Sequence, residues 1–258
     1  MATAKKSNTL GQILKTQGYT ALLERIEILD PKEFKNLTHT DSEKPISQLD
    51  LLLFNVPDLY YVKDDEGKNT KIPEAGVFEF IDWAVKNGAS PNSTIKYGNS
   101  AFLKSAGLPE ESLLKYFVEN IPEINITQKD GRGADILMHS VASQSLEVFD
   151  YVNSLQEFDI NKQYTLLNNK TILHVACALG EKPMIDKILD AGGDLTIMDN
   201  TGSIPADMIP TKTESPLSEE ETTPDKIEQW EQLFTNLAEL SKKAVKDKKS
   251  VKNYKTSF

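Results

Sequence analysis

The sequence predicts an all-α protein in which pairs of helices stack into a solenoid. The first observation is that residues 170–199 have the pattern of helix, turn, helix, glycine stop and extended arm. The second is that related segments recur at intervals of 33 to 36 residues, a spacing typical of repeat proteins. The third is composition, because 39% of the 258 residues are apolar and 26% charged, with only 13 Gly and 12 Pro, so most of the chain is expected to fold.

Residues 1–42 are expected to form a helical cap at the N-terminal end of the stack. Apolar residues recur at helical spacing from Thr9 to Leu29, with a break near Gly18, and Asp30 with Pro31 begins a further helix. The end of a repeat array needs a polar outer surface, and a separate cap provides one.

The first repeat is expected to carry an insertion at residues 55–76. Its first helix is PISQLDLLLF (residues 45–54). Its second helix lies in VFEFIDWAVKNGASPN (residues 77–92), where Gly88 is the glycine stop. Within the insertion, LYYV and TKI flank the turn-prone DDEGKN and can pair as a small hairpin. Tyr60 and Tyr61 would then project toward a partner, and the alternative is that both rings pack on the first repeat.

The following repeats are recognised by equivalent positions. Ser100, Asp135, Thr171 and Ile204 each precede a first helix, at separations of 35, 36 and 33 residues. The pattern is clearest after Thr171, where Leu173, Val175 and Ala176 form one apolar face, Gly180 ends the helix, and Met184, Ile185, Ile188 and Leu189 form the face of the next. Gly192 and Gly193 then suit a left-handed helix end, and the repeat that begins near Ile204 is cut short at residue 210.

These segments resemble the ankyrin-repeat family. TILHVA, Gly180, IDKILDAGGDL and DNTGSIPADM are similar to the family patterns TPLHxAA, G, IVxxLLxxGADV and DxxGxTPLH. The resemblance covers residues 43–210 and implies four repeats and a truncated fifth, each with a β-hairpin arm. The sequence departs from the family at Leu103, Met138 and Asp207, which replace its histidine, and at Asp135, which replaces its threonine.

Three segments follow the repeats. Residues 211–223 are acidic and polar and are predicted to be a linker, whereas residues 224–245 begin with an N-cap and proline and form an amphipathic helix. Its apolar face contains Ile227, Trp230, Leu233, Phe234, Leu237, Leu240 and Ala244. This face either closes the end of the solenoid or meets a partner. Residues 246–258 form a basic tail, which is either solvated or an electrostatic contact for an acidic partner, nucleic acid or a membrane surface.

Charge and cysteine content exclude several classes of function. The net charge is −10 although residues 241–258 hold seven Lys and one Asp, so the folded body is strongly acidic and unsuited to sequence-independent nucleic-acid binding. The single cysteine, Cys177, allows no internal disulfide and fits a reducing compartment. We find no Sec-type signal peptide and no apolar run long enough to span a membrane, so a soluble cytoplasmic protein is expected.

The sequence also predicts that the protein is not an enzyme and needs no cofactor or metal. His174 and Cys177 lie three residues apart, but the resemblance implies that His174 braces an arm by hydrogen bonds and that Cys177 packs between repeats. His39 and His139 have no neighbour at zinc-ligand spacing. The GRGAD segment at Gly131 lacks the spacing of a phosphate-binding loop.

The resemblance implies a protein-interaction module, an adaptor or inhibitor that binds through its concave face and its arms. Carried over position by position, the expected contact residues are Lys104, Leu108, Ser143 and Leu179 on the concave face, and Lys129, Arg132, Met198 and Asn200 on the arms. The partner is a protein of unknown identity, and the chain alone is expected to be monomeric. The alternative is a host-directed bacterial or viral factor, acting in the host cytoplasm, whose acidic surface blocks a nucleic-acid-handling protein.

Overall fold

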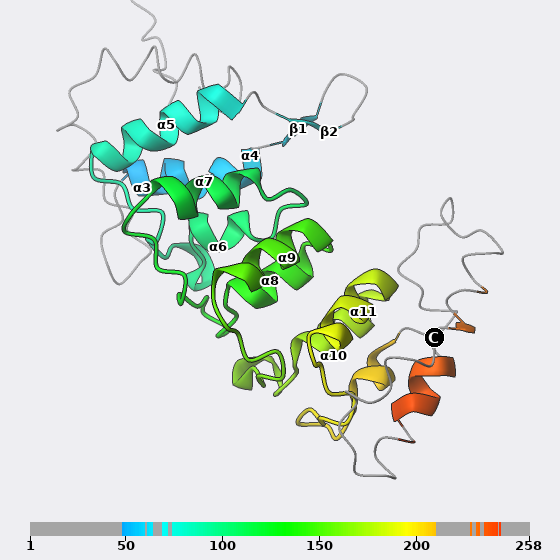
Figure 1. Cartoon of the computed structure of the whole chain (residues 1–258). Helices are drawn as coiled ribbons and strands as arrows, with labels where there is room; N and C mark the ends of the chain where they lie inside the picture. Colours follow the sequence, from blue (N-terminus) through cyan, green and yellow to red (C-terminus); the bar gives the residue numbers. More distant parts are fainter. Residues whose placement is uncertain are drawn as a thin grey trace, which may run out of the picture. The chain divides into compact units, whose positions relative to one another are not determined.

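The computed structural model of the chain is predominantly helical, in agreement with the predicted all-α class (Figure 1). It describes residues 48–59, 61–63, 69–71 and 74–209, together with residues 228, 231–232, 235–241 and 243. The predicted N-terminal cap, Tyr60, the acidic linker and the basic tail lie outside the described residues. The chain divides into two compact units: unit 1 contains residues 1–105 and 112–130, and unit 2 contains residues 106–111 and 131–258.

Unit 1 combines short helices with one small hairpin. Its elements are α3 (Gln48–Phe54), α4 (Val56–Leu59), β1 (Tyr61–Lys63), β2 (Asn69–Lys71), α5 (Glu74–Lys86), η1 (Lys96–Gly98), α6 (Ala101–Ser105) and α7 (Ser112–Asn120). Helix α3 packs against α5, α4 against α6, and α6 against α7. The fully buried rings of Phe80, Phe102 and Phe117 contribute the largest side chains to the core of this unit.

Helical residues occupy both ends of the predicted insertion at residues 55–76. Helix α5 begins at Glu74, three residues before the predicted start, and α4 occupies the first part of the insertion. Strands β1 and β2 pair antiparallel, with Tyr61 opposite Lys71 and Lys63 opposite Asn69, which confirms the predicted hairpin. The side chain of Tyr61 lies outside the described part, so both predictions for the two tyrosines stay open.

Unit 2 contains two helix pairs that pack on each other. Its elements are α8 (Ile136–Ala142), α9 (Leu146–Leu155), η2 (Thr165–Leu167), α10 (Ile172–Leu179), α11 (Lys182–Asp190) and η3 (Pro205–Met208). Within the pairs, α8 packs on α9 and α10 on α11; between the pairs, α10 packs on α8 and α11 on α9. The short η3 packs on α10 where the sequence predicts a truncated repeat.

Local sequence explains where these helices begin and end. Asp135 caps α8, because its side chain accepts a hydrogen bond from the Met138 N–H, and Thr171 caps α10 in the same way through the His174 N–H. Helix α10 ends at Gly180, which has a left-handed backbone with φ of 72°, as predicted. At Gly193 a β-carbon would lie 2.9 Å from the Ile188 carbonyl oxygen, so only glycine allows this close approach.

The apolar faces predicted for the clearest helix pair are largely confirmed. Leu173, Ile185 and Ile188 are fully buried, and Met184 is nearly so. Val175 and Leu189 are only half-buried, because each lies at the edge of its helix face.

The described residues near the C-terminus are helical, in agreement with the predicted helix at residues 224–245. Leu237 and Ser241, one turn apart, are buried, whereas Thr235 and Glu239 are exposed. One face of this helix is therefore covered. Of the other predicted apolar residues, Leu240 is half-buried, and the rest lie outside the described residues.

Candidate functional site

The predicted contact residues are divided between the two units. Lys104 and Lys129 belong to unit 1, and the other six described ones to unit 2. The exposed ones are Lys129, Arg132, Met198 and Asn200, all on the predicted arms. Those of the predicted concave face are half-buried: Lys104, Leu108, Ser143 and Leu179. The residues predicted on the arms are therefore more exposed than those predicted on the concave face.

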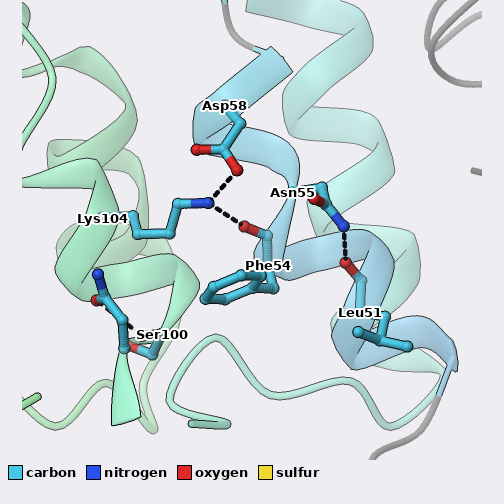
Figure 2. A network of polar contacts seen from close by, with 7 residues as sticks. Leu51, Phe54, Asn55, Asp58, Ser100 and Lys104 are labelled. Carbon is cyan, nitrogen blue, oxygen red and sulfur yellow. Dashed lines mark hydrogen bonds and ion pairs between the residues drawn. The ribbon is translucent and has the colours of Figure 1, made fainter. Parts of the chain in front are cut away.

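Lys104 is held inside unit 1. Its Nζ donates a 3.0 Å hydrogen bond to the carbonyl oxygen of Phe54, the last residue of α3, and forms an ion pair with Asp58 of α4 (Figure 2). It also lies 4.1 Å from the centroid of the Phe54 ring. Burial lowers the pKa of the Lys104 ammonium, and the bond and charge of Asp58 oppose that shift. Lys104 is therefore a clamp between helices, which the sequence prediction of a partner contact did not anticipate.

Ser143 also has an internal role. Its Oγ donates to the Ser140 carbonyl oxygen at 2.6 Å and accepts from the Ser145 N–H at 3.1 Å. These bonds close the turn between α8 and α9, where Ser145 caps the second helix. Its hydroxyl is occupied by the turn that holds the helix pair together.

Two arms of unit 2, residues 163–170 and 196–203, are joined by three hydrogen bonds. The Asn200 N–H donates to the Asn168 carbonyl oxygen at 2.8 Å, and the Asn169 amide donates to the Asn200 Oδ1 at 2.6 Å. The Gln163 amide donates to the Met198 carbonyl oxygen at 2.9 Å. The structure thus places Met198 and Asn200 beside the neighbouring arm, and these hydrogen bonds hold the two arms together.

Each arm is also closed by its own hydrogen bonds. In the 163–170 arm, Tyr164 and Lys170 form an isolated antiparallel bridge. In the 196–203 arm, the Asp199 carboxylate accepts from the Thr201 N–H, the Thr201 hydroxyl and the Ser203 N–H. The hydrogen bonds from Thr201 lower the pKa of the Asp199 carboxyl, so this residue stays ionised and keeps the arm closed.

These two arms present apolar side chains to solvent. Leu166 is 68% exposed and Met198 is 53% exposed, and with Tyr97 of unit 1 they are the exposed large hydrophobic residues of the described chain. Leu166 also reaches the preceding arm, because a β-carbon at Gly133 would lie 3.9 Å from its Cδ1. We name the surface formed by Leu166, Met198 and Asn200 the arm edge. Sequence reasoning missed Leu166, since a leucine between predicted helices is usually assigned to the core.

The arm edge carries little negative charge although the chain is acidic. No Asp or Glu occurs between Asp159 and Glu181, a stretch that contains the whole 163–170 arm. The one acid of the 196–203 arm, Asp199, is buried. The side chains that define the arm edge are therefore apolar or amide groups.

The 163–170 arm is anchored to the start of helix α8. Asp135, the N-cap of α8, accepts a 2.7 Å hydrogen bond from the Tyr164 hydroxyl and forms an ion pair with Lys162. Burial raises the pKa of Tyr164 far above its usual range, so the phenol remains a donor. Asp135 stands where the family pattern has threonine, and here the carboxylate serves both as cap and as anchor.

The neutral imidazole ring of His174 anchors the 196–203 arm by a hydrogen bond. Its Nδ1 accepts from the Thr171 N–H at 3.1 Å, so Nε2 carries the proton and donates to the Ser203 carbonyl oxygen at 3.1 Å. Burial lowers the pKa of His174, which favours this neutral form.

The thiol of Cys177 is buried. Burial raises the pKa of this thiol to about 12, so the thiol is not ionised at neutral pH.

Among the described residues, no cluster of three or more His, Cys, Asp or Glu side chains is placed to hold a metal ion. In the same part of the chain, no helix has the length and apolar character needed to cross a membrane.

Comparison with protein-family models and with curated proteins gave no match for this chain.

Proposed function

We propose that this chain is a non-enzymatic protein-interaction module, an adaptor or inhibitor, built on an ankyrin-type repeat array and binding through its arms. The observation that carries the proposal is the arm edge, where exposed Leu166 and Met198 lie on two arms that hydrogen bonds hold together. Exposed apolar side chains on a rigid surface are typical of the centre of a protein interface.

The ankyrin-type arrangement is supported by contacts that repeat along the chain. Each N-cap before a first helix is tied to the arm that follows it: Ser100 to Gln128, Asp135 to Tyr164, and the Thr171–His174 cap to Ser203. Ser100 and Gln128 are 28 positions apart, and Asp135 and Tyr164 are 29 positions apart. The third contact is made by His174 of the cap and not by the N-cap Thr171, so it joins a different pair of positions. The similar separation of the first two contacts is expected when equivalent units follow one another in a repeat array.

The non-enzymatic part of the proposal is supported by the use that the chain makes of its reactive side chains. Both ring nitrogens of His174 are occupied by hydrogen bonds that hold α10 and the 196–203 arm. Cys177 is fully buried with a raised pKa. Neither group is presented to a substrate as base or nucleophile.

Affinity capture with the intact chain, followed by mass spectrometry, identifies the partner, and two variants then test the surface. Leu166→Ser with Met198→Ser is expected to weaken binding by at least about tenfold, because the apolar anchors are lost. The matched control is Asn153→Ser, a change at an exposed position of α9. Equal binding by the double variant and the parent chain would rule out the arm edge.

A salt series separates this proposal from the alternative of an acidic blocking surface. Binding centred on Leu166 and Met198 is expected to change little as ionic strength rises. A complex held by the net charge of −10 would weaken steeply over the same range. A steep salt dependence together with full binding by the double variant would favour the host-directed acidic factor instead.

A further inference from the structure

Tyr97 in unit 1 is the most exposed large hydrophobic side chain of the described chain, at 78% exposure. Its backbone is left-handed, with φ of 56° and ψ of 31°, a conformation that a non-glycine residue adopts only at a cost. The chain therefore keeps an aromatic ring where it buries little area and where glycine would fit the backbone better. Because neither the exposed ring nor the left-handed backbone stabilises unit 1, we consider a role in binding.

The loop that carries Tyr97, residues 93–99, is closed on both sides of the ring. The Ile95 N–H donates to the Asn99 carbonyl oxygen at 2.8 Å, and the Asn99 N–H donates to the Lys96 carbonyl oxygen at 3.0 Å. The Asn99 side chain accepts a 2.9 Å hydrogen bond from the N–H of the next residue, Ser100, just before α6. Tyr97 is thus presented on a preorganised turn, so little conformational entropy is lost when it binds.

The segment that contains this loop carries no acidic side chain of its own, although the Asp50 carboxylate accepts a hydrogen bond from the Ser90 N–H just before it. No Asp or Glu occurs between Asp82 and Glu110, although the protein has 39 acidic residues and a net charge of −10. The exposed Lys96 places its Nζ 5.3 Å from the centroid of the Tyr97 ring, within cation–π distance. The loop therefore offers an aromatic ring, a phenol hydroxyl and an ammonium group side by side.

The composition of the loop is that of an adaptable binding surface. The segment NSTIKYGNS, residues 92–100, is made mostly of Asn, Ser, Thr, Gly and Tyr. In antibody binding loops the same residue types supply rigid aromatic contact area and adjustable hydrogen bonds.

We propose that the 93–99 loop is a second partner-binding site, which takes a carboxylate-bearing segment of a protein. The Tyr97 ring packs on an apolar group beside the carboxylate, and the Tyr97 hydroxyl and the Lys96 ammonium donate to its oxygens. This inference rests on the proposed function in that the ligand is a protein. It goes beyond the proposed function by naming a second binding loop and by specifying that the bound segment of the partner is acidic.

Charge complementarity favours an acidic polypeptide over the other occupants. The charge that the loop itself presents is the exposed Lys96 ammonium, which attracts a carboxylate and repels a cationic group. A nucleic acid is less suited, because its affinity depends on neutralising several phosphates and the loop offers the single cation Lys96.

The experiment uses a display library of short random peptides selected on the intact chain. We expect the selected peptides to be enriched in Asp and Glu next to an apolar residue. Their affinity is expected to fall at least about tenfold for Lys96→Gln and for Tyr97→Gly. Glycine at position 97 removes the strain of the left-handed backbone in the folded chain, but it also gives the unfolded chain more conformational freedom. Because these effects oppose each other, the melting temperature of Tyr97→Gly is expected to stay about unchanged. A loss of peptide affinity can then be assigned to the missing ring.

The controls make failure of this inference distinguishable from failure of the proposed function. Lys86→Gln makes the same charge change at an exposed residue of α5 within the same acid-free stretch and should bind the peptides normally. The arm-edge variant, Leu166→Ser with Met198→Ser, should also bind them normally. Selection of basic or uncharged peptides, binding that survives in Tyr97→Gly, or equal Tyr97-dependent binding of a single-stranded oligonucleotide would each overturn the inference.

Discussion

The side-chain amide of Asn161 in unit 2 makes the same pair of hydrogen bonds that Asn92 makes in unit 1. Each amide donates to a carbonyl oxygen 31 residues further along the chain and accepts from an N–H 33 residues further along. The partners are Glu123 and Asn125 for Asn92, and Gly192 and Asp194 for Asn161. Both separations are close to the spacing by which the repeats are recognised in the sequence, so the two asparagines occupy equivalent positions.

The first prediction is that Asn161→Ala destabilises the protein by about 1 to 3 kcal/mol and Asn92→Ala by less. Each change removes two hydrogen bonds, but those of Asn161 are part-buried, whereas those of Asn92 are exposed and water can replace the lost partner. Urea unfolding of each variant gives the free energy of unfolding, with Asn153→Ala at an exposed position of α9 as the control. A neutral effect at either asparagine would show that its amide does not hold the following loop in solution.

The second prediction concerns the clamp in unit 1. Lys104→Met is expected to cost about 1 to 2 kcal/mol, because the Phe54 carbonyl oxygen loses its donor and Asp58 loses its ion pair. Asp58→Asn should cost less, since that side chain is 55% exposed and solvent screens its charge. Amide hydrogen exchange should also rise in α4 of Lys104→Met, and unchanged exchange there would mean that the clamp does not hold α4.

Local patterns predicted much of this fold, and contacts between distant residues decided the rest. The end of α10 at Gly180 and the buried faces of α10 and α11 depend on nearby residues, so helical spacing was sufficient. The clamp at Lys104 depends on Phe54 and Asp58, which lie 50 and 46 residues earlier, and no local pattern indicates it.

The candidate site was predicted only in part, for a similar reason. Met198 and Asn200 were expected because the resemblance assigns those positions to an arm. Leu166 and Tyr97 were missed because leucine and tyrosine are usually buried, and their exposure follows from turns at η2 and η1. An acid-free stretch around each residue is the signal in the sequence that could have found them.

The third prediction is a pH dependence that comes from His174. Because burial lowers its pKa below 6.5, the unfolded chain binds a proton more readily than the folded chain does. The stability from neutral His174 is therefore fully present above about pH 6.5 and is lost as the pH falls toward the folded pKa. Asp199, whose pKa is lowered, contributes a loss only at much lower pH, below its ordinary value of 3.8.

The measurement compares the parent chain with His174→Gln in urea unfolding from about pH 7.5 to pH 5.5. The variant is expected to be less stable throughout, because the anchor to Ser203 is weakened, but to lose less stability on acidification. The other two histidines are present in both proteins and cancel in the difference. Parallel curves would show that His174 titrates as it does in the unfolded chain.

The fourth prediction is that Cys177 resists alkylation in the folded protein. Its thiol is fully buried with a pKa of about 12, so at pH near 8 it is both protonated and inaccessible. Labelling by iodoacetamide should therefore proceed only through unfolding, and the urea-unfolded chain should react at once. Cys177→Ala should fold with a loss of about 1 to 2 kcal/mol and keep partner binding. Rapid labelling of the native protein, or selective loss of activity in a folded Cys177→Ala variant, would contradict a packing role.

The last prediction concerns the C-terminal helix, whose Leu237 is 1% exposed within unit 2. If this covered face closes the end of the repeat array, Leu237→Ala should cost about 2 to 5 kcal/mol, because a buried leucine leaves a cavity. Glu239→Ala, at an exposed position of the same helix, is the control and should change stability by less than about 0.5 kcal/mol.

Two truncations separate a cap from a partner-binding helix. Deletion from residue 224 onward removes the whole helix, so it should lower the melting temperature and promote association as the apolar end of the array becomes exposed. Deletion from residue 246 onward removes only the basic tail and should leave both properties unchanged. Thermal unfolding and sedimentation measure the two effects. If the longer deletion leaves a monomer of equal stability and Leu237→Ala is neutral, the helix is not a cap, and its apolar face becomes a candidate partner site.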